Sequence, residues 1–141
     1  MKFSRKGGEI FKVNRRGTSK FLGDLEARVM EVVWKLGEAT VREVKEHLEK
    51  GGKKLAYTTV LTEMQNLEKK GLLKSRREQK KNVYSPTVSR KEFLDKMVGD
   101  TLKSLIEDFP EEVISHLLPE EEVDEEEIKR LLKLLKERRY R

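Results

Sequence analysis

Between residues 24 and 71, apolar residues recur every three or four positions in three short stretches, and each stretch ends at a glycine. That spacing is typical of amphipathic helices, and glycine is common just after a helix ends. The three predicted helices cover residues 24–36, 41–50 and 56–70, and they stop at Gly37, Gly51 and Gly71. Thr40 and Glu43 form a capping box at the start of the second helix. The first half of the chain is therefore expected to contain three small helices.

The segment after the third helix alternates apolar and polar residues in two short runs. Residues 72–78 and 83–86 form the runs, and they flank a basic turn, Gln79-Lys80-Lys81-Asn82. This pattern predicts a β-hairpin. Three small helices followed by a hairpin make a winged helix-turn-helix, in which the third helix enters the DNA major groove and the wing lies along the backbone. The predicted fold class is mainly α with a small β-hairpin wing.

The outer face of the third helix is unusual in composition. An ordinary solvent-facing helix surface is rich in Glu, Lys and Arg, whereas Thr and Asn are mediocre helix formers. Hydroxyl, methyl and amide groups are the types that read base edges in the major groove. At 100° per residue, such groups gather opposite the apolar side, which holds Tyr57, Val60, Leu61, Met64 and Leu67. We predict base readout, rather than a solvated face, for Thr58, Thr59, Thr62, Gln65 and Asn66.

Charge is divided unevenly along the chain. Residues 1–91 contain 23 Lys and Arg against 11 Asp and Glu, whereas residues 92–141 contain 9 against 15. A basic half of this size fits a polyanionic partner, although composition alone fits a merely solubilised surface equally well. Position favours the first interpretation, because several cations lie in or beside the predicted helix and wing. The predicted backbone contacts are Tyr57, Lys69, Lys74, Arg76, Arg77, Lys80 and Lys81.

Several classes of protein are excluded by what the sequence lacks. There is no cysteine, and His47 and His116 are isolated, so we predict no metal site, no cofactor and no enzymatic activity. No apolar run exceeds three residues, whereas a membrane span needs roughly 20 and a signal peptide about 7 to 15. We therefore expect a cytoplasmic protein that does not contact membranes. Residues 1–20 form a basic arm, either a disordered leader or an arm that follows a DNA groove.

Residues 89–141 are predicted to form a helical dimerisation domain. Ser89 with Glu92 and Asp124 with Glu127 are capping boxes, and Val123 can staple to Ile128. Three helices in so few residues bury little surface by themselves, so the excess apolar surface favours a homodimer. The predicted dimerisation residues are Phe93, Met97, Leu102, Leu105, Ile106, Phe109, Leu117, Ile128, Leu131, Leu132 and Leu135. A two-fold dimer would place its recognition helices about 34 to 36 Å apart, or a multiple of that, on a palindromic operator.

Three segments resemble a known family. Residues 25–34, residues 57–60 with 67–73, and residues 83–86 look like the first helix, recognition helix and wing strand of the BlaI/MecI-type penicillinase and methicillin-resistance repressors. The resemblance covers about residues 22–138. It implies a homodimeric repressor with an N-terminal winged helix and a C-terminal helical dimerisation domain.

The resemblance also implies roles for single residues. Thr58, Thr59 and Thr62 would approach the bases, Arg76 would approach the DNA backbone, and Trp34 would be a packing residue. Two features depart from the family. Asp108-Phe109 stands where members induced by β-lactam signalling are cut at an Asn-Phe bond, and the cysteine cluster of copper-responsive relatives is missing.

The sequence therefore predicts a sequence-specific, dimeric transcriptional repressor whose partners are double-stranded DNA and a second copy of itself. Its expected parts are a basic arm over residues 1–20, a winged helix over 21–88 and a dimerisation domain over 89–141. Two alternatives stay open. One is an architectural protein that coats DNA without sequence preference, and the other is a protein-interaction adaptor, because fold does not fix function. The sequence indicates neither the operator nor the inducing signal.

Overall fold

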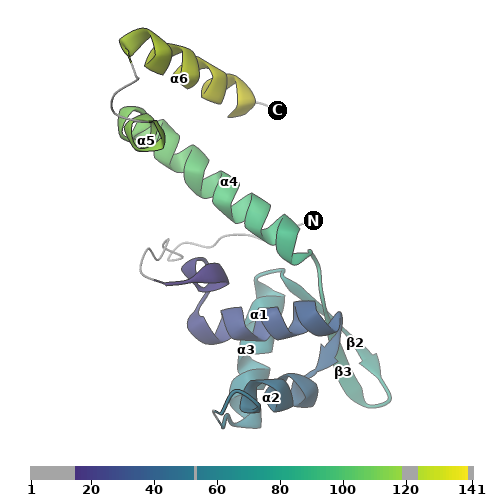
Figure 1. Ribbon diagram of the computed structural model, residues 1–141. Coiled ribbons are helices and arrows are strands. Elements are labelled where there is room, and N and C mark those ends of the chain that lie inside the picture. The colour runs from purple at the N-terminus through teal and green to yellow at the C-terminus, as the bar shows by residue number, and fades with distance from the viewer. Residues whose placement is uncertain (1–14, 53, 119–123, 140–141) are drawn as a thin grey trace. The chain divides into compact units, whose positions relative to one another are not determined.

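The computed structural model describes residues 15–52, 54–118 and 124–139 (Figure 1). Residues 1–14 of the predicted arm and Val123 of the predicted staple lie outside these ranges. The chain forms two compact units, which we call the N-terminal unit (residues 1–94) and the C-terminal unit (residues 95–141). The division falls six residues after the domain boundary that the sequence suggested.

Three helices form the centre of the N-terminal unit: α1 (Asp24–Leu36), α2 (Val41–Glu49) and α3 (Tyr57–Lys69). Their ends agree with those of the predicted helices to within one residue. Each turns its apolar stripe inward, and Val29 and Val33 of α1, Val44 of α2 and Met64 of α3 are completely buried. The capping box at the start of α2 is confirmed, because the Glu43 backbone N–H donates to Thr40 Oγ1 at 3.2 Å and the Thr40 N–H donates to Glu43 Oε1 at 3.0 Å. The sequence placed Tyr57 on the inner side of α3, but its side chain is 50% exposed. Tyr57 is the first residue of α3 and borders a hollow at that end of the helix.

The wing is part of a three-stranded antiparallel sheet with the order β1-β3-β2. Its strands are β1 (Ala39–Thr40), β2 (Leu73–Glu78) and β3 (Lys81–Pro86). Strand β1 was not predicted, because two residues are too few for an alternating pattern to be visible. Its pairing of Ala39 with Tyr84 joins the wing to the connection between α1 and α2.

The turn of the wing is shorter than predicted. Only Gln79 and Lys80 connect the strands, while Lys81 and Asn82 already belong to β3. Both turn residues have positive φ, 48° and 67°, as a two-residue turn that matches the twist of the strands requires. Neither residue is glycine or asparagine, so this conformation is energetically unfavourable for their side chains.

The predicted arm does not extend to residue 20 as a separate segment. Gly17–Lys20 form a short 3-10 helix, η1, against α1, and Thr18 within it is buried. The following residues, Phe21 and Leu22, are also buried. The last residues of the predicted arm therefore belong to the folded N-terminal unit.

Helix α4 (Arg90–Asp108) begins inside the N-terminal unit, and its first turn helps to close that unit's core. Its predicted cap is confirmed, because the Glu92 N–H donates to Ser89 Oγ at 3.0 Å. Phe93 is only 1% exposed, with ring centroids 5.6 Å from Trp34 and 6.4 Å from Phe21. The indole N–H of Trp34 donates to the Val88 carbonyl oxygen at 2.9 Å, which supports its predicted packing role.

Two predicted dimerisation residues are therefore corrected. Phe93 is a core residue of the N-terminal unit, and Met97, 2% exposed, is also buried within the single chain. The apolar pattern of a helix does not show which of its residues pack inside the same chain and which stay exposed.

The C-terminal unit contains the rest of α4, α5 (Pro110–Leu117) and α6 (Glu125–Arg139). Pro110 stands at the start of α5, as predicted, and Asp124 Oδ1 accepts from the Glu127 N–H at 2.7 Å at the start of α6. Leu102, Leu105, Phe109 and Leu117 are between 40% and 67% exposed. The half-buried residues are Ile106, Ile128, Leu131 and Leu132. The side chain of Leu135 is not among those that the structure describes.

Candidate nucleic-acid interface

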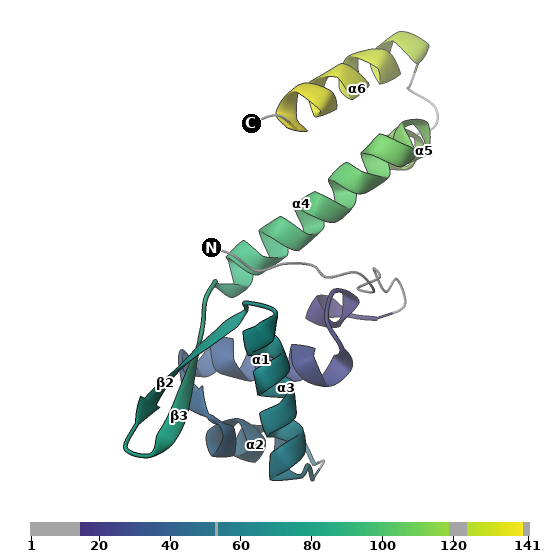
Figure 2. The same cartoon turned by 180° about the vertical axis from the view of Figure 1, so that it is seen from behind.

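Helix α3 presents the predicted readout residues to solvent. Thr58, Thr59, Thr62 and Gln65 are exposed and Asn66 is half-buried. The opposite side of the helix is held in the core by Val60, Met64 and Leu67, which are fully buried. The 3.6-residue period thus fixes which side can meet a ligand, and among the described residues Thr58, Thr59, Thr62 and Gln65 stay exposed. Figure 2 shows α3 in front of α1, with the wing to its left.

The hydroxyl of Thr62 is partly committed to its own helix. Its Oγ1 donates to the Thr58 carbonyl oxygen at 2.8 Å. A threonine hydroxyl has one hydrogen to donate and two lone pairs. Thr62 therefore offers an acceptor and a methyl group, whereas no such bond occupies the hydroxyls of Thr58 and Thr59 within the described ranges.

A hollow of about 350 Å³ lies between the start of α3, the start of α2 and the wing. We call it the wing groove. Its lining residues are Thr40, Val41, Arg42, Tyr57, Leu61, Arg77, Lys80, Lys81 and Asn82. Four of the nine carry positive charge, and none is acidic. The groove therefore suits an anionic group such as a phosphate.

Three of the predicted backbone contacts from the wing meet at this groove: Arg77, Lys80 and Lys81. Tyr57 joins them from α3. Lys69, at the end of α3, and Lys74, on β2, are exposed but do not line it. The predicted set therefore separates into residues that surround one hollow and residues that lie elsewhere on the surface.

Arg42 is a candidate that the sequence analysis missed. It is exposed near the start of α2 and lines the wing groove together with the wing cations. On the sequence it is one charged residue on the polar side of an amphipathic helix, which is the most common place for an arginine. Only the packing of α2 beside the wing brings it to the groove, so no local signal could have identified it.

The two faces of the wing have different surroundings. Side chains alternate across a strand, so Ser75 and Arg77 of β2 share one face with Tyr84 of β3, and Arg76 and Glu78 occupy the other. The first face looks toward the helices, because Tyr84 is buried and Ser75 Oγ donates to Glu68 Oε2 of α3 at 2.7 Å. Arg77 accordingly lies on the groove side, where its Nη1 is 3.5 Å from Asn82 Oδ1.

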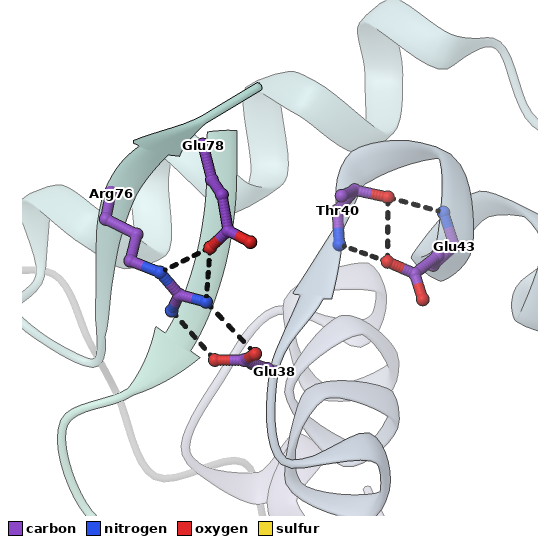
Figure 3. A network of polar contacts seen from close by, with 5 residues as sticks. All are labelled: Glu38, Thr40, Glu43, Arg76 and Glu78. Carbon is purple, nitrogen blue, oxygen red and sulfur yellow. Dashed lines mark hydrogen bonds and ion pairs between the residues drawn. The ribbon is translucent and has the colours of Figure 1, made fainter. Parts of the chain in front are cut away.

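Arg76 points to the other face and is held by two carboxylates (Figure 3). Its Nη1 and Nη2 donate to the two oxygens of Glu38 at 2.8 and 3.1 Å. Its Nε donates to Glu78 Oε2 at 3.0 Å, and Nη2 lies 2.8 Å from the same oxygen. These bonds raise the pKa of Arg76 and, with its charge, lower the pKa of Glu38. The guanidinium that the sequence assigned to phosphates is thus engaged within the protein.

A second group of charges lies behind α3, away from the wing groove. Lys70 Nζ lies 2.9 Å from Glu26 Oε1, and the same oxygen accepts from the Gly23 N–H at 3.1 Å. Burial and the nearby charge of Glu26 raise the pKa of Glu63, and Lys70 opposes that shift. This group joins the start of α1 to the end of α3 and so helps to hold α3 in its orientation.

No group of three or more acidic or histidine side chains in the described residues is arranged to hold a metal ion. Over the same ranges, no helix combines the length and apolar character that crossing a bilayer requires.

Comparison with known proteins gives a match to the family model described as penicillinase repressor, over residues 22–137. The chain belongs to the penicillinase repressor family. The predicted resemblance is confirmed.

Two relatives with known names are similar to this chain over different lengths. The transcriptional regulator BlaI of Mycobacterium tuberculosis is 42% identical over 82 residues, which cover 57% of this chain and 59% of that protein. The penicillinase repressor of Bacillus licheniformis is 28% identical over 128 residues, covering 85% of this chain and 93% of that protein. Both are named as regulators, which agrees with the prediction of a protein that is not an enzyme.

Among solved structures, the DNA-binding domain of the repressor BlaI is 32% identical to this chain, with a TM-score of 0.44. The matched region covers 48% of this chain and 82% of the BlaI domain. RosR of H. salinarum is 17% identical, with a TM-score of 0.47, and the matched region covers 86% of this chain and 97% of the RosR chain.

Proposed function

We propose that this repressor family member binds double-stranded DNA as a sequence-specific homodimer and represses transcription from a palindromic operator. The observation that carries the proposal is the exposed face of α3, which presents Thr58, Thr59 and Gln65 on the same helix whose Tyr57 and Leu61 line a groove with four cations. The names of the relatives, transcriptional regulator and penicillinase repressor, support the same function.

In the proposed complex, α3 enters the major groove. Its amide groups would read adenine, its hydroxyls would serve several bases, and its methyl groups would contact thymine. Thr58 and Thr59 lie in the first turn, which is the part of a recognition helix that reaches base edges. Because Thr62 donates to its own helix, it would act through its methyl group and its lone pairs.

The wing groove would hold the sugar-phosphate backbone beside this helix. Arg42 approaches it from α2, and Arg77, Lys80 and Lys81 approach it from the wing. Such contacts position the protein but carry no sequence information. They should therefore appear as salt dependence, with a slope of about −0.9 per phosphate.

Dimerisation is proposed for the C-terminal unit. Leu105 and Phe109, which are four residues apart in sequence, are 43% and 53% exposed, and Leu117 of α5 is 67% exposed. Contiguous exposed apolar side chains are typical of a surface that a partner covers. A second copy is the proposed partner, because two recognition helices on one two-fold axis would match a palindromic site.

The test is selection of bound duplexes from a random pool by the full chain, followed by titration of the selected and scrambled duplexes at several salt concentrations. We expect a palindromic consensus and a dimer in sedimentation of the complex. Thr58→Ala should cost about 1 to 3 kcal/mol on the selected duplex and little on the scrambled one.

The backbone contacts need a different readout. Arg77→Gln should weaken binding of both duplexes and make the salt slope shallower by about 0.9. Lys103→Gln, which removes the same charge from an exposed position of α4 in the C-terminal unit, serves as the matched control. Equal affinity for selected and scrambled DNA would favour the architectural alternative, and absence of DNA binding would favour the adaptor.

A further inference from the structure

The two adjacent arginines of the wing are in opposite electrostatic situations. Arg77 lies on the groove side with an amide oxygen at 3.5 Å. Arg76 lies on the other face, and all three of its guanidinium nitrogens have a carboxylate oxygen at 2.8 to 3.1 Å. One cation of the wing is therefore available to a phosphate, and its neighbour is already neutralised.

Of the two carboxylates that bind Arg76, Glu38 is the one that lies outside the hairpin. Glu78 lies two residues from Arg76 on the same strand and moves with it. Glu38 lies before β1, outside the hairpin, and binds both terminal nitrogens in the two-pronged geometry that carboxylates and phosphates share. As Figure 3 shows, the Glu38 carboxylate faces the guanidinium from the side opposite Glu78. Glu38 thus occupies the donors that a phosphate would need.

The ion pair is also exposed to competition. The side chains of Arg76 and Glu38 are 49% and 53% exposed, so solvent, salt and an approaching polyanion can all reach them. Exposed ion pairs contribute little to folding stability. Loss of the Glu38 charge should consequently free Nη1 and leave Arg76 with a single carboxylate, Glu78, on Nε and Nη2. The wing should stay folded, because its backbone is held by the pairing of β3 with both neighbouring strands.

We propose that Glu38 is a positioning residue for DNA binding, which holds Arg76 away from the phosphate backbone and so limits the sequence-independent affinity of the wing. The inference rests on the proposed function. Phosphate contacts strengthen binding to every sequence alike. Glu38 therefore sets how much of the total affinity comes from charge, while α3 sets the preference among sequences.

The experiment is a thermodynamic cycle in the full chain. Glu38→Gln, Arg76→Gln and the double variant are titrated with the selected and the scrambled duplex between 50 and 200 mM salt. Glu38→Gln should bind both duplexes more tightly, and its salt slope should be steeper by about 0.9, which means that affinity falls about 3.5-fold more over this range. Arg76→Gln alone should leave the slope of the unchanged protein intact. The double variant should show no gain.

Two controls exclude simpler explanations. Glu46→Gln removes the same charge from an exposed position of α2 outside the Arg76 network, so a gain of equal size there would show that overall charge alone is responsible. Thermal unfolding of each variant separates a loosened wing from a changed contact, because a purely structural role for Glu38 would not steepen the salt slope.

Three results would overturn the inference: no gain for Glu38→Gln, a gain that persists in the double variant, or a shallower slope for Arg76→Gln alone. In each case binding by the unchanged protein can still prefer the selected duplex, and the proposed function then stands without the role of Glu38. If the unchanged protein binds no DNA or prefers no sequence, it is the proposed function that fails.

Discussion

Replacement of Phe93 by alanine tests whether this residue belongs to the core or to a dimer interface. The side chain is 1% exposed and packs against Trp34 and Phe21. Removing a buried phenylalanine costs about 3 to 5 kcal/mol, including the cavity that is left. A unit of 94 residues is expected to have a total stability of about 5 to 14 kcal/mol. Phe93→Ala should therefore remove a large fraction of it.

The magnitude is large enough to be measured directly. For a unit of this size each kcal/mol shifts Tm by about 4 to 8 °C, so a fall of at least about 12 °C is expected. Trp34 is the single tryptophan of the chain and lies against the altered residue, so its fluorescence reports unfolding of the N-terminal unit. Urea and thermal unfolding are followed at several protein concentrations.

Leu105→Ala provides the contrast, because Leu105 is 43% exposed in the C-terminal unit. It should change the unfolding of the N-terminal unit by less than about 0.5 kcal/mol, as surface substitutions usually do, and act on self-association instead. The reasoning is refuted if Phe93→Ala unfolds within about 1 kcal/mol of the unchanged protein. It is equally refuted if the loss disappears as protein concentration rises, because that dependence is the signature of an interface residue.

Two further predictions concern local strain and titration. Gln79→Gly should raise the unfolding free energy by about 0.5 kcal/mol. Glycine adopts the positive φ of 48° without steric cost, and this gain exceeds the cost of its greater flexibility in the unfolded chain. Urea unfolding measures the change, and a loss of stability would contradict the turn geometry. Burial and the charge of Glu26 raise the pKa of Glu63, so its charged form is disfavoured by folding and stability should fall as pH rises above the ordinary glutamate value of 4.5. Glu63→Gln should accordingly leave Tm unchanged near pH 4 and raise stability by about 0.5 kcal/mol at pH 7; a stabilisation that is the same at both pH values speaks against this cause.

Much of the site could be predicted from the sequence because it depends on a single helix. The period of Val60, Met64 and Leu67 determines which side of α3 is buried, and the remaining side must then expose Thr58 and Gln65. The capping boxes were equally local, since donor and acceptor lie three residues apart. Whether these side chains contact DNA stays a prediction that the binding experiments test.

The sequence by itself determined the helices, their caps, the existence of the wing and the polar face of α3, because each follows from spacing within one segment. Only the tertiary structure decided what lies between segments. It engaged Arg76 with Glu38, which precedes it by 38 positions, brought Arg42 to the wing groove and buried Phe93 against Trp34. The physical reason is that side-chain partnership depends on distance in space. An arginine in a strand has the same local pattern whether a carboxylate or a phosphate will meet it.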